Sequence, residues 1–209
     1  MVNDKRGYNV AIYAVMLALI FVAMMLDRVI SLALPVSMAL LTLLVTFTCC
    51  FWRNSWQSGV LACVFFGVAS MIKGAIFPEP IPLSINPLVS VLPRAVMGFA
   101  TFGVYRLMLR CFKNRKSYKN QVLCLTVAIF VGLVVNTVLF LSAANLYKMV
   151  LGEQYTGVFA TIYLVLFTNI IPEYAVSMLF APHLILAVRK ATHLGIEGNG
   201  LENKKVTQE

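Results

Sequence analysis

Residues 120–145 read NQVLCLTVAIFVGLVVNTVLFLSAAN, a run of 26 residues without a charged side chain. At a rise of 1.5 Å per residue, a helix over this run is about 39 Å long, enough to cross the roughly 30 Å hydrocarbon core of a bilayer. The run does not alternate strictly between apolar and polar residues, as a half-buried strand would. It therefore predicts a transmembrane helix.

Five further apolar blocks accompany this run, near residues 9–26, 33–52, 57–73, 87–109 and 157–188. Of the 209 residues, 60% are hydrophobic and 12% are charged, and the mean hydropathy is +0.86. A soluble domain usually has about a quarter charged residues. We therefore predict an all-α integral membrane bundle of six transmembrane helices over residues 1–190, followed by a polar cytoplasmic tail over residues 191–209. Six spans leave no room for a soluble enzymatic domain.

Basic residues fall between the apolar blocks and indicate the orientation of the bundle. The chain has 17 Lys and Arg against 8 Asp and Glu, a net charge of +9. With six spans, one side holds thirteen of the basic residues: Lys5, Arg6, Arg53, Arg106, Arg110, Lys113, Arg115, Lys116, Lys119, Arg189, Lys190, Lys204 and Lys205. The other side holds Arg28, Lys73 and Lys148. Because Lys and Arg accumulate in cytoplasmic loops, both termini are predicted to be cytoplasmic. The positive charge thus reports topology and does not indicate a nucleic-acid partner.

The cysteines offer no sign of a metal or redox site. They show neither a CxxC pair nor a Cys/His cluster at metal-ligand spacing. We interpret them as reduced residues that pack within apolar helices. The five are Cys49, Cys50, Cys63, Cys111 and Cys124.

Ionisable residues inside a span are costly and are therefore candidate functional positions. Arg94 and Glu173 qualify, whereas Asp27 and Arg28 are assigned to the outer boundary of the first span, where they would reach headgroups and water. The helical rise places Arg94 roughly 10 Å below the outer surface. Its guanidinium is expected to bind an anionic group of a ligand.

Other polar groups are expected to converge at a similar depth. Asn169 and Glu173 are four residues apart and share a helix face, and Asn136 lies in the block before them. Phe140 and Tyr163 would add aromatic walls, which together with a few polar groups make a cavity for a small polar molecule. We expect the asparagines and Glu173 to recognise its neutral part. The alternative is a structural ion pair between Arg94 and Glu173, with asparagines that bond across helices.

Two further segments have local signatures. KGAIFPEPIPLSINP, residues 73–87, holds four prolines and is predicted to be an extended, stiff connector, either a lid over the cavity or an ordinary link. Gly59, Cys63 and Gly67 recur every four residues, a spacing that lets helix backbones approach closely. We interpret that stripe as internal packing.

The motif NPLVSVLPRAVMG, residues 86–98, preceded by GVLACVFFGVASMIKG, residues 59–74, resembles the substrate-binding S component of energy-coupling factor (ECF) vitamin transporters. The resemblance covers nearly all of the chain up to about Lys190, and the pantothenate type is the most similar. It implies a pocket formed by the outer halves of helices four to six and by the first and outer loops. Asn86 and Ser90 of the motif join the candidate substrate-binding residues.

The resemblance also implies partners. An Ala-xxx-Ala motif, matched by Ala14 and Ala18, would dock on a membrane coupling protein (T component) driven by two ATPases, unless this strip faces the core of the bundle. The sequence has no Walker A loop, so ATP would be used by those partners. It offers only one buried acid, Glu173, so the chain itself is expected to be neither an enzyme nor a holder of a cofactor or metal. The implied location is the bacterial plasma membrane. The alternatives are an S component for folate, riboflavin, cobalamin or a pyridoxine-like compound, or a small integral-membrane enzyme using Glu173 and a histidine.

Overall fold

Within the described parts of the chain, all regular elements are α-helices. The computed structural model describes residues 2–33, 39–53, 55–77, 85–112, 117–150 and 170–192. The helices are α1 (Val2–Ala33), α2 (Leu40–Trp52), α3 (Trp56–Ile76), α4 (Pro87–Ser90), α5 (Leu92–Cys111), α6 (Tyr118–Val150) and α8 (Ile171–Ala191). The prediction of an all-α fold is confirmed for these residues.

Among the residues that the structure describes, five segments are long and apolar enough to cross a membrane. They are Val10–Ser31, Trp56–Ile76, Pro87–Cys111, Tyr118–Tyr147 and Ile171–Ala191. The sixth apolar helix, α2, has only 13 residues and is therefore about 20 Å long, shorter than a full span. Several long apolar helices of this kind make the chain a multi-pass membrane protein.

Several predicted boundaries differ from the structure. α2 begins at Leu40 and not near residue 33, and α3 continues to Ile76, so it includes the first four residues of the predicted connector. The predicted fourth span is broken at Val91 into α4 and α5, because Pro93 has no amide to donate to the carbonyl four residues earlier. The remainder of the proline-rich segment, residues 78–84, lies outside the described residues, as do residues 157–169 of the predicted last span and the tail from residue 193.

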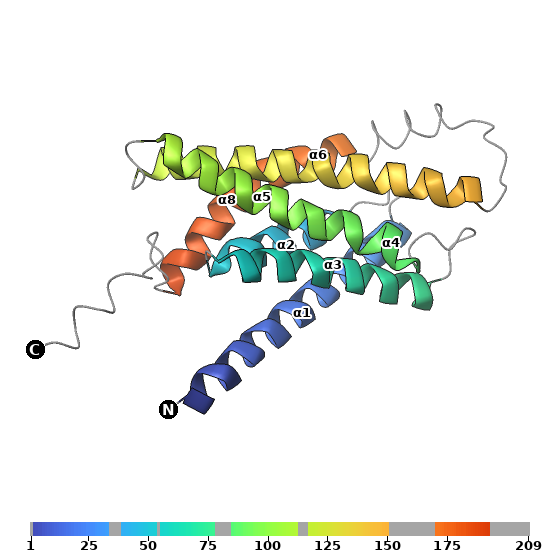
Figure 1. The fold of residues 1–209 in the computed structure, drawn as a ribbon, viewed down its shortest axis with the longest axis horizontal. Coiled ribbons are helices and arrows are strands. Elements are labelled where there is room, and N and C mark those ends of the chain that lie inside the picture. Colours follow the sequence, from blue (N-terminus) through green and yellow to red (C-terminus); the bar gives the residue numbers. More distant parts are fainter. Residues whose placement is uncertain are drawn as a thin grey trace, which may run out of the picture.

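The helices form a bundle in which α5 and α6 run side by side, with α3 next to α5 (Figure 1). α2 packs against α1, α3 and α8. α1 crosses the other helices obliquely, and its first turns extend away from them (Figure 1). The start of α1 and the end of α8 lie on the same side of the view.

Glycines let these helices approach closely. A Cβ atom at Gly67 would lie 2.8 Å from the Cα of Val91, so α3 contacts the turn between α4 and α5 directly. A Cβ atom at Gly98 would lie 3.1 Å from the Cα of Val60 on α3. Gly59 and Cys63 are also buried between helices, which confirms that the small-residue stripe of α3 serves internal packing.

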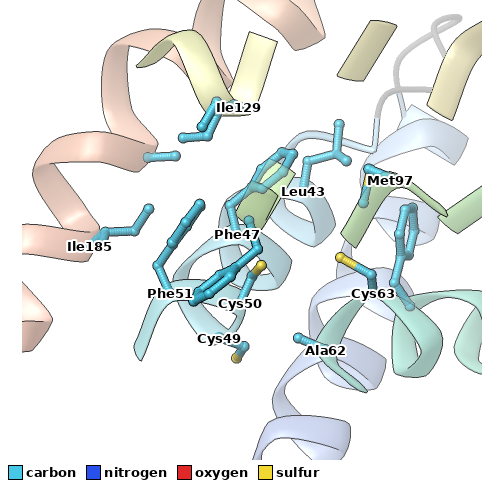
Figure 2. Packing of buried hydrophobic residues seen from close by; sticks show 14 of the residues in the cluster. Leu43, Phe47, Cys49, Cys50, Phe51, Ala62, Cys63, Met97, Ile129 and Ile185 are labelled. Carbon is cyan, nitrogen blue, oxygen red and sulfur yellow. The ribbon is translucent and has the colours of Figure 1, made fainter. Parts of the chain in front are cut away.

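The core is formed by side chains from α1, α2, α3, α5, α6 and α8, and part of it surrounds Phe47 and Phe51 (Figure 2). Phe51 stands edge-on to Tyr105, with 4.9 Å between ring centroids. Cys50 and Cys63 lie in this cluster, and all five cysteines are free thiols, of which only Cys111 is exposed.

Candidate functional site

A cavity of about 210 Å³ lies where α1 and α3 end and α2 and α5 begin. Four helices contribute to its wall, and the wall carries three cations and one carboxylate. The lining residues are Met24, Asp27, Arg28, Ser31, Ala39, Thr42, Phe66, Ser70, Lys73 and Arg94. Positive groups therefore outnumber the negative group at this site.

Arg94 is held in place from several sides. Its Nη1 donates to the carbonyl oxygen of Ser90 and, at 3.1 Å, to the Ser90 hydroxyl, while Nη2 donates to the Ser70 hydroxyl at 3.1 Å. The guanidinium carbon lies 4.5 Å from the ring centroid of Phe66 and 5.7 Å from that of Phe140. Gly67 allows α3 to contact the Ser90–Val91 turn, and this close approach brings Ser70 within reach of Arg94.

The hydrogen bonds of Arg94 leave part of the guanidinium uncommitted. The side chain is 9% exposed, and its Nε has no hydrogen-bond partner among the described residues. Nη2 carries two N–H groups and makes one described bond. Nε and Nη2 form one edge of the guanidinium fork, the edge that binds a carboxylate side-on. Every described acceptor of Arg94 is neutral, so the buried charge has no described counterion.

The one carboxylate among the described lining residues is engaged elsewhere. Asp27 accepts from the amides of Leu41 and Thr42, at 3.1 and 2.8 Å, and from the Thr42 hydroxyl at 2.6 Å. These amides belong to the first turn of α2, which otherwise leaves them without acceptors. Arg28, the neighbouring cation, lies 5.4 Å from the ring centroid of Phe77.

The assignment of Asp27 to a water-exposed boundary is wrong. Asp27 is only 7% exposed, because it reaches across to α2 and binds its N-terminal end. A sequence signal for this role is the absence of a capping side chain in α2 itself, whose N-cap residue is Ala39. A helix that begins inside an apolar bundle without its own cap needs an acceptor from another helix.

The structure brings three of the predicted site residues together. Arg94 of α5 contacts both Ser90 of α4 and Phe140 of α6. Asn136 lies one turn from Phe140 on α6, and its buried Oδ1 has no hydrogen-bond partner among the described residues. Asn169 and Tyr163 lie outside the described residues.

Two other predicted site residues act elsewhere. Asn86 is the N-cap of α4, where its side chain accepts from the Leu88 amide at 3.0 Å. Glu173 accepts from the Ala39 amide at 2.7 Å and does not line the cavity. The described contacts of Arg94 and Glu173 thus involve different partners and do not show the ion pair weighed from the sequence. The cavity lies among α1, α2, α3 and α5, whereas the resemblance implied a pocket over the last three spans.

A second buried arginine lies at the opposite end of α2. Arg189 of α8 is 3% exposed and donates from Nε to the Phe51 carbonyl and from Nη1 to the Tyr105 hydroxyl, both at 2.9 Å. The sequence places Arg189 among the basic residues of the cytoplasmic side. In the structure its charge interacts with the carbonyl end of α2, where the helix dipole is negative. Nearby on α8, His183 is hydrogen-bonded through Nδ1 to Tyr118 at 2.6 Å.

The side chains of Ala14 and Ala18 are both exposed on α1. The residues of α1 that pack into the bundle are on another face and include Met16, Ile20 and Met24. The structure therefore places the two alanines away from the core.

Comparison with known proteins adds nothing to this geometry: no protein-family model, no curated protein and no solved structure matches the chain.

Proposed function

We propose that the chain is the S component of an ECF-type importer, which captures a small water-soluble vitamin, most simply pantothenate, at the outer face of a bacterial plasma membrane. In this proposal six helices cross the membrane with both termini in the cytoplasm. The chain itself catalyses no reaction and holds no cofactor. The observation that carries the proposal is the buried, uncompensated guanidinium of Arg94 in the wall of the cavity.

The charge of Arg94 favours an anionic ligand. A buried cation without a counterion loses several kcal/mol of hydration. A carboxylate bound along the Nε and Nη2 edge would replace this lost hydration with charged hydrogen bonds. Three hydrogen bonds to two serines and two aromatic rings hold the guanidinium before any ligand arrives. Little side-chain entropy is then lost on binding.

The size of the cavity favours a compact vitamin. Ligand pockets for drug-sized molecules are roughly 300–1,000 Å³, and this cavity is about 210 Å³. Pantothenate, with one carboxylate, two hydroxyls and an amide, suits such a volume better than folate, riboflavin or cobalamin do. Ser31, Ser70 and Thr42 supply hydroxyl groups to its polar part.

Binding is tested by isothermal titration of the purified full-length chain with pantothenate. The proposal expects saturable binding, with riboflavin and folate as size controls that do not compete. The proposal would be refuted if the chain showed a cooperative thermal unfolding transition but bound neither pantothenate nor either of the other two vitamins.

The proposed partners are a membrane coupling protein and two ATPases. Support comes from the exposed Ala14 and Ala18 on α1, because small side chains at a four-residue spacing admit another helix at close range. Ala18→Trp is expected to leave pantothenate affinity of the purified chain unchanged and to abolish uptake into cells. Leu19→Trp, at an exposed site on the same helix but outside the stripe of Ala14 and Ala18, is the matched control and should retain uptake. Normal uptake by Ala18→Trp would exclude this docking surface.

A further inference from the structure

The N-terminal end of α2 forms part of the cavity wall. Ala39 and Thr42 both line the cavity. Ala39 is the N-cap residue of α2, and Thr42 lies in its first turn. The amides of a helix start need acceptors, and an apolar bundle offers no bulk water to supply them. The position of this wall therefore depends on the side chains that bind these amides.

Two carboxylates from different helices supply the acceptors. Asp27 of α1 binds the amides of Leu41 and Thr42, and Glu173 of α8 binds the amide of Ala39 at 2.7 Å. Negative charges at this end also interact favourably with the helix dipole of α2. Asp27 lies in the cavity wall itself, whereas Glu173 reaches the site only through Ala39.

We propose that Glu173 is a positioning residue for the ligand site: its carboxylate fixes Ala39, the N-cap residue of α2, and so sets the shape of the cavity around the ligand without touching the ligand. Glu173 sits on α8, which contributes no described residue to the cavity. The site therefore depends on a helix that does not line it. The ligand-binding part of this inference rests on the proposed function.

The first experiment measures, without a ligand, how accessible position 39 in the cavity wall is to a labelling reagent. In a Cys111→Ser background, which removes the exposed native thiol, Ala39→Cys serves as a reporter, because its backbone amide remains available to Glu173. The probe is a water-soluble methanethiosulfonate, and the readout is the rate of labelling. Glu173→Met fills a similar volume without a comparable acceptor, and Glu173→Gln keeps an oxygen acceptor without the charge.

The expected result is at least fivefold faster labelling in Glu173→Met and a rate within twofold of the parent in Glu173→Gln. Ser177→Ala is the matched control, since Ser177 is buried one turn further along α8 and its hydroxyl has no hydrogen-bond partner among the described residues. Its labelling rate should equal that of the parent. An unchanged rate in Glu173→Met overturns the inference.

The second experiment measures pantothenate affinity in the same variants with Ala39 restored. Glu173→Met should bind at least tenfold more weakly, and Glu173→Gln should bind within threefold of the wild type. Equal weakening in both variants, at unchanged labelling rates, would mean that the Glu173 charge contacts the ligand and would overturn the positioning role. If the wild type binds no pantothenate, the proposed function fails for this vitamin, while the labelling rates still decide the role of Glu173. If Glu173→Met does not fold, Glu173→Ser, whose shorter side chain cannot reach Ala39, replaces it in both measurements.

Discussion

Two buried arginines, Arg94 and Arg189, differ in what surrounds their charge. Arg189 donates to the Phe51 carbonyl at the end of α2, where the helix dipole is negative, and to the Tyr105 hydroxyl. Arg94 donates to Ser90 and Ser70, which are neutral, and lies in the wall of a cavity. Both guanidiniums thus have neutral acceptors, and each keeps one buried nitrogen without a partner among the described residues, Nη2 of Arg189 and Nε of Arg94. The difference is that Arg94 lines the cavity and Arg189 does not.

This difference separates a structural charge from a candidate binding charge. Burial alone does not distinguish them, since both side chains are at least nine-tenths buried. What distinguishes them is position: Arg94 lines the cavity, whereas Arg189 binds the carbonyl end of α2 away from it. A structural arginine should matter for stability without ligand, and a binding arginine should matter for affinity.

The largest effect is expected at Arg189. Arg189→Ala removes two hydrogen bonds from a charged donor and leaves the end of α2 unsatisfied, which should lower the free energy of unfolding by about 3 kcal/mol. Thermal unfolding of the purified chain in detergent measures the loss. The folded fraction should still bind pantothenate with near wild-type affinity.

If Arg189→Ala gives no folded protein, Tyr105→Phe tests the same contact more gently. It removes only the hydroxyl that accepts from Nη1, with an expected loss of roughly 1.5 kcal/mol. A wild-type unfolding temperature in both variants would contradict the structural role of Arg189.

The next effect is expected at Arg94, in the opposite pattern. Arg94→Ala should weaken pantothenate binding by about 2 kcal/mol, roughly 30-fold, because a charged hydrogen-bonding group is lost from a desolvated site. Its ligand-free stability should fall by less than that of Arg189→Ala, because Arg94 lines a polar cavity in which water can take the place of the lost guanidinium. Titration calorimetry and thermal unfolding separate the two quantities.

Arg94→Lys sharpens this test. It keeps the charge but removes the planar fork, so affinity should fall between those of the wild type and the alanine variant. Unchanged affinity in Arg94→Ala would remove Arg94 from the binding site, and a large loss of ligand-free stability would make it a structural residue like Arg189.

The smallest effect is expected at Phe140, whose ring centroid lies 5.7 Å from the Arg94 guanidinium carbon. Phe140→Leu should reduce pantothenate affinity by about 0.5–1 kcal/mol through loss of a cation–π contact that orients Arg94. Phe130→Leu, on the same helix and in contact with Tyr174, is the control and should leave affinity unchanged. Equal effects of the two substitutions would mean that Phe140 acts through general packing.

The sequence by itself determined that the chain is a multi-pass membrane protein and where most of its helices lie. Apolar runs such as residues 120–145 report burial in lipid locally, residue by residue, so they need no knowledge of neighbours. Arg94 could be singled out in the same way, because a charge deep in an apolar run is costly wherever its partners lie. The late start of α2 at Leu40 and the break at Val91 were not predicted, because hydropathy does not mark where a helix begins or breaks within an apolar run.

Only the tertiary structure decided what the polar groups bind. Glu173 and Ala39 are 134 residues apart, and Arg189 and Phe51 are 138 apart. The sequence places Asp27 at a water-exposed boundary, whereas the structure makes it the acceptor for the start of α2. Such pairings depend on which helix faces meet, and close approaches such as that of Gly67 to Val91 set those faces. Hydropathy describes single residues along the chain and does not describe contacts between distant helices. It therefore located the charged residues but did not assign their partners.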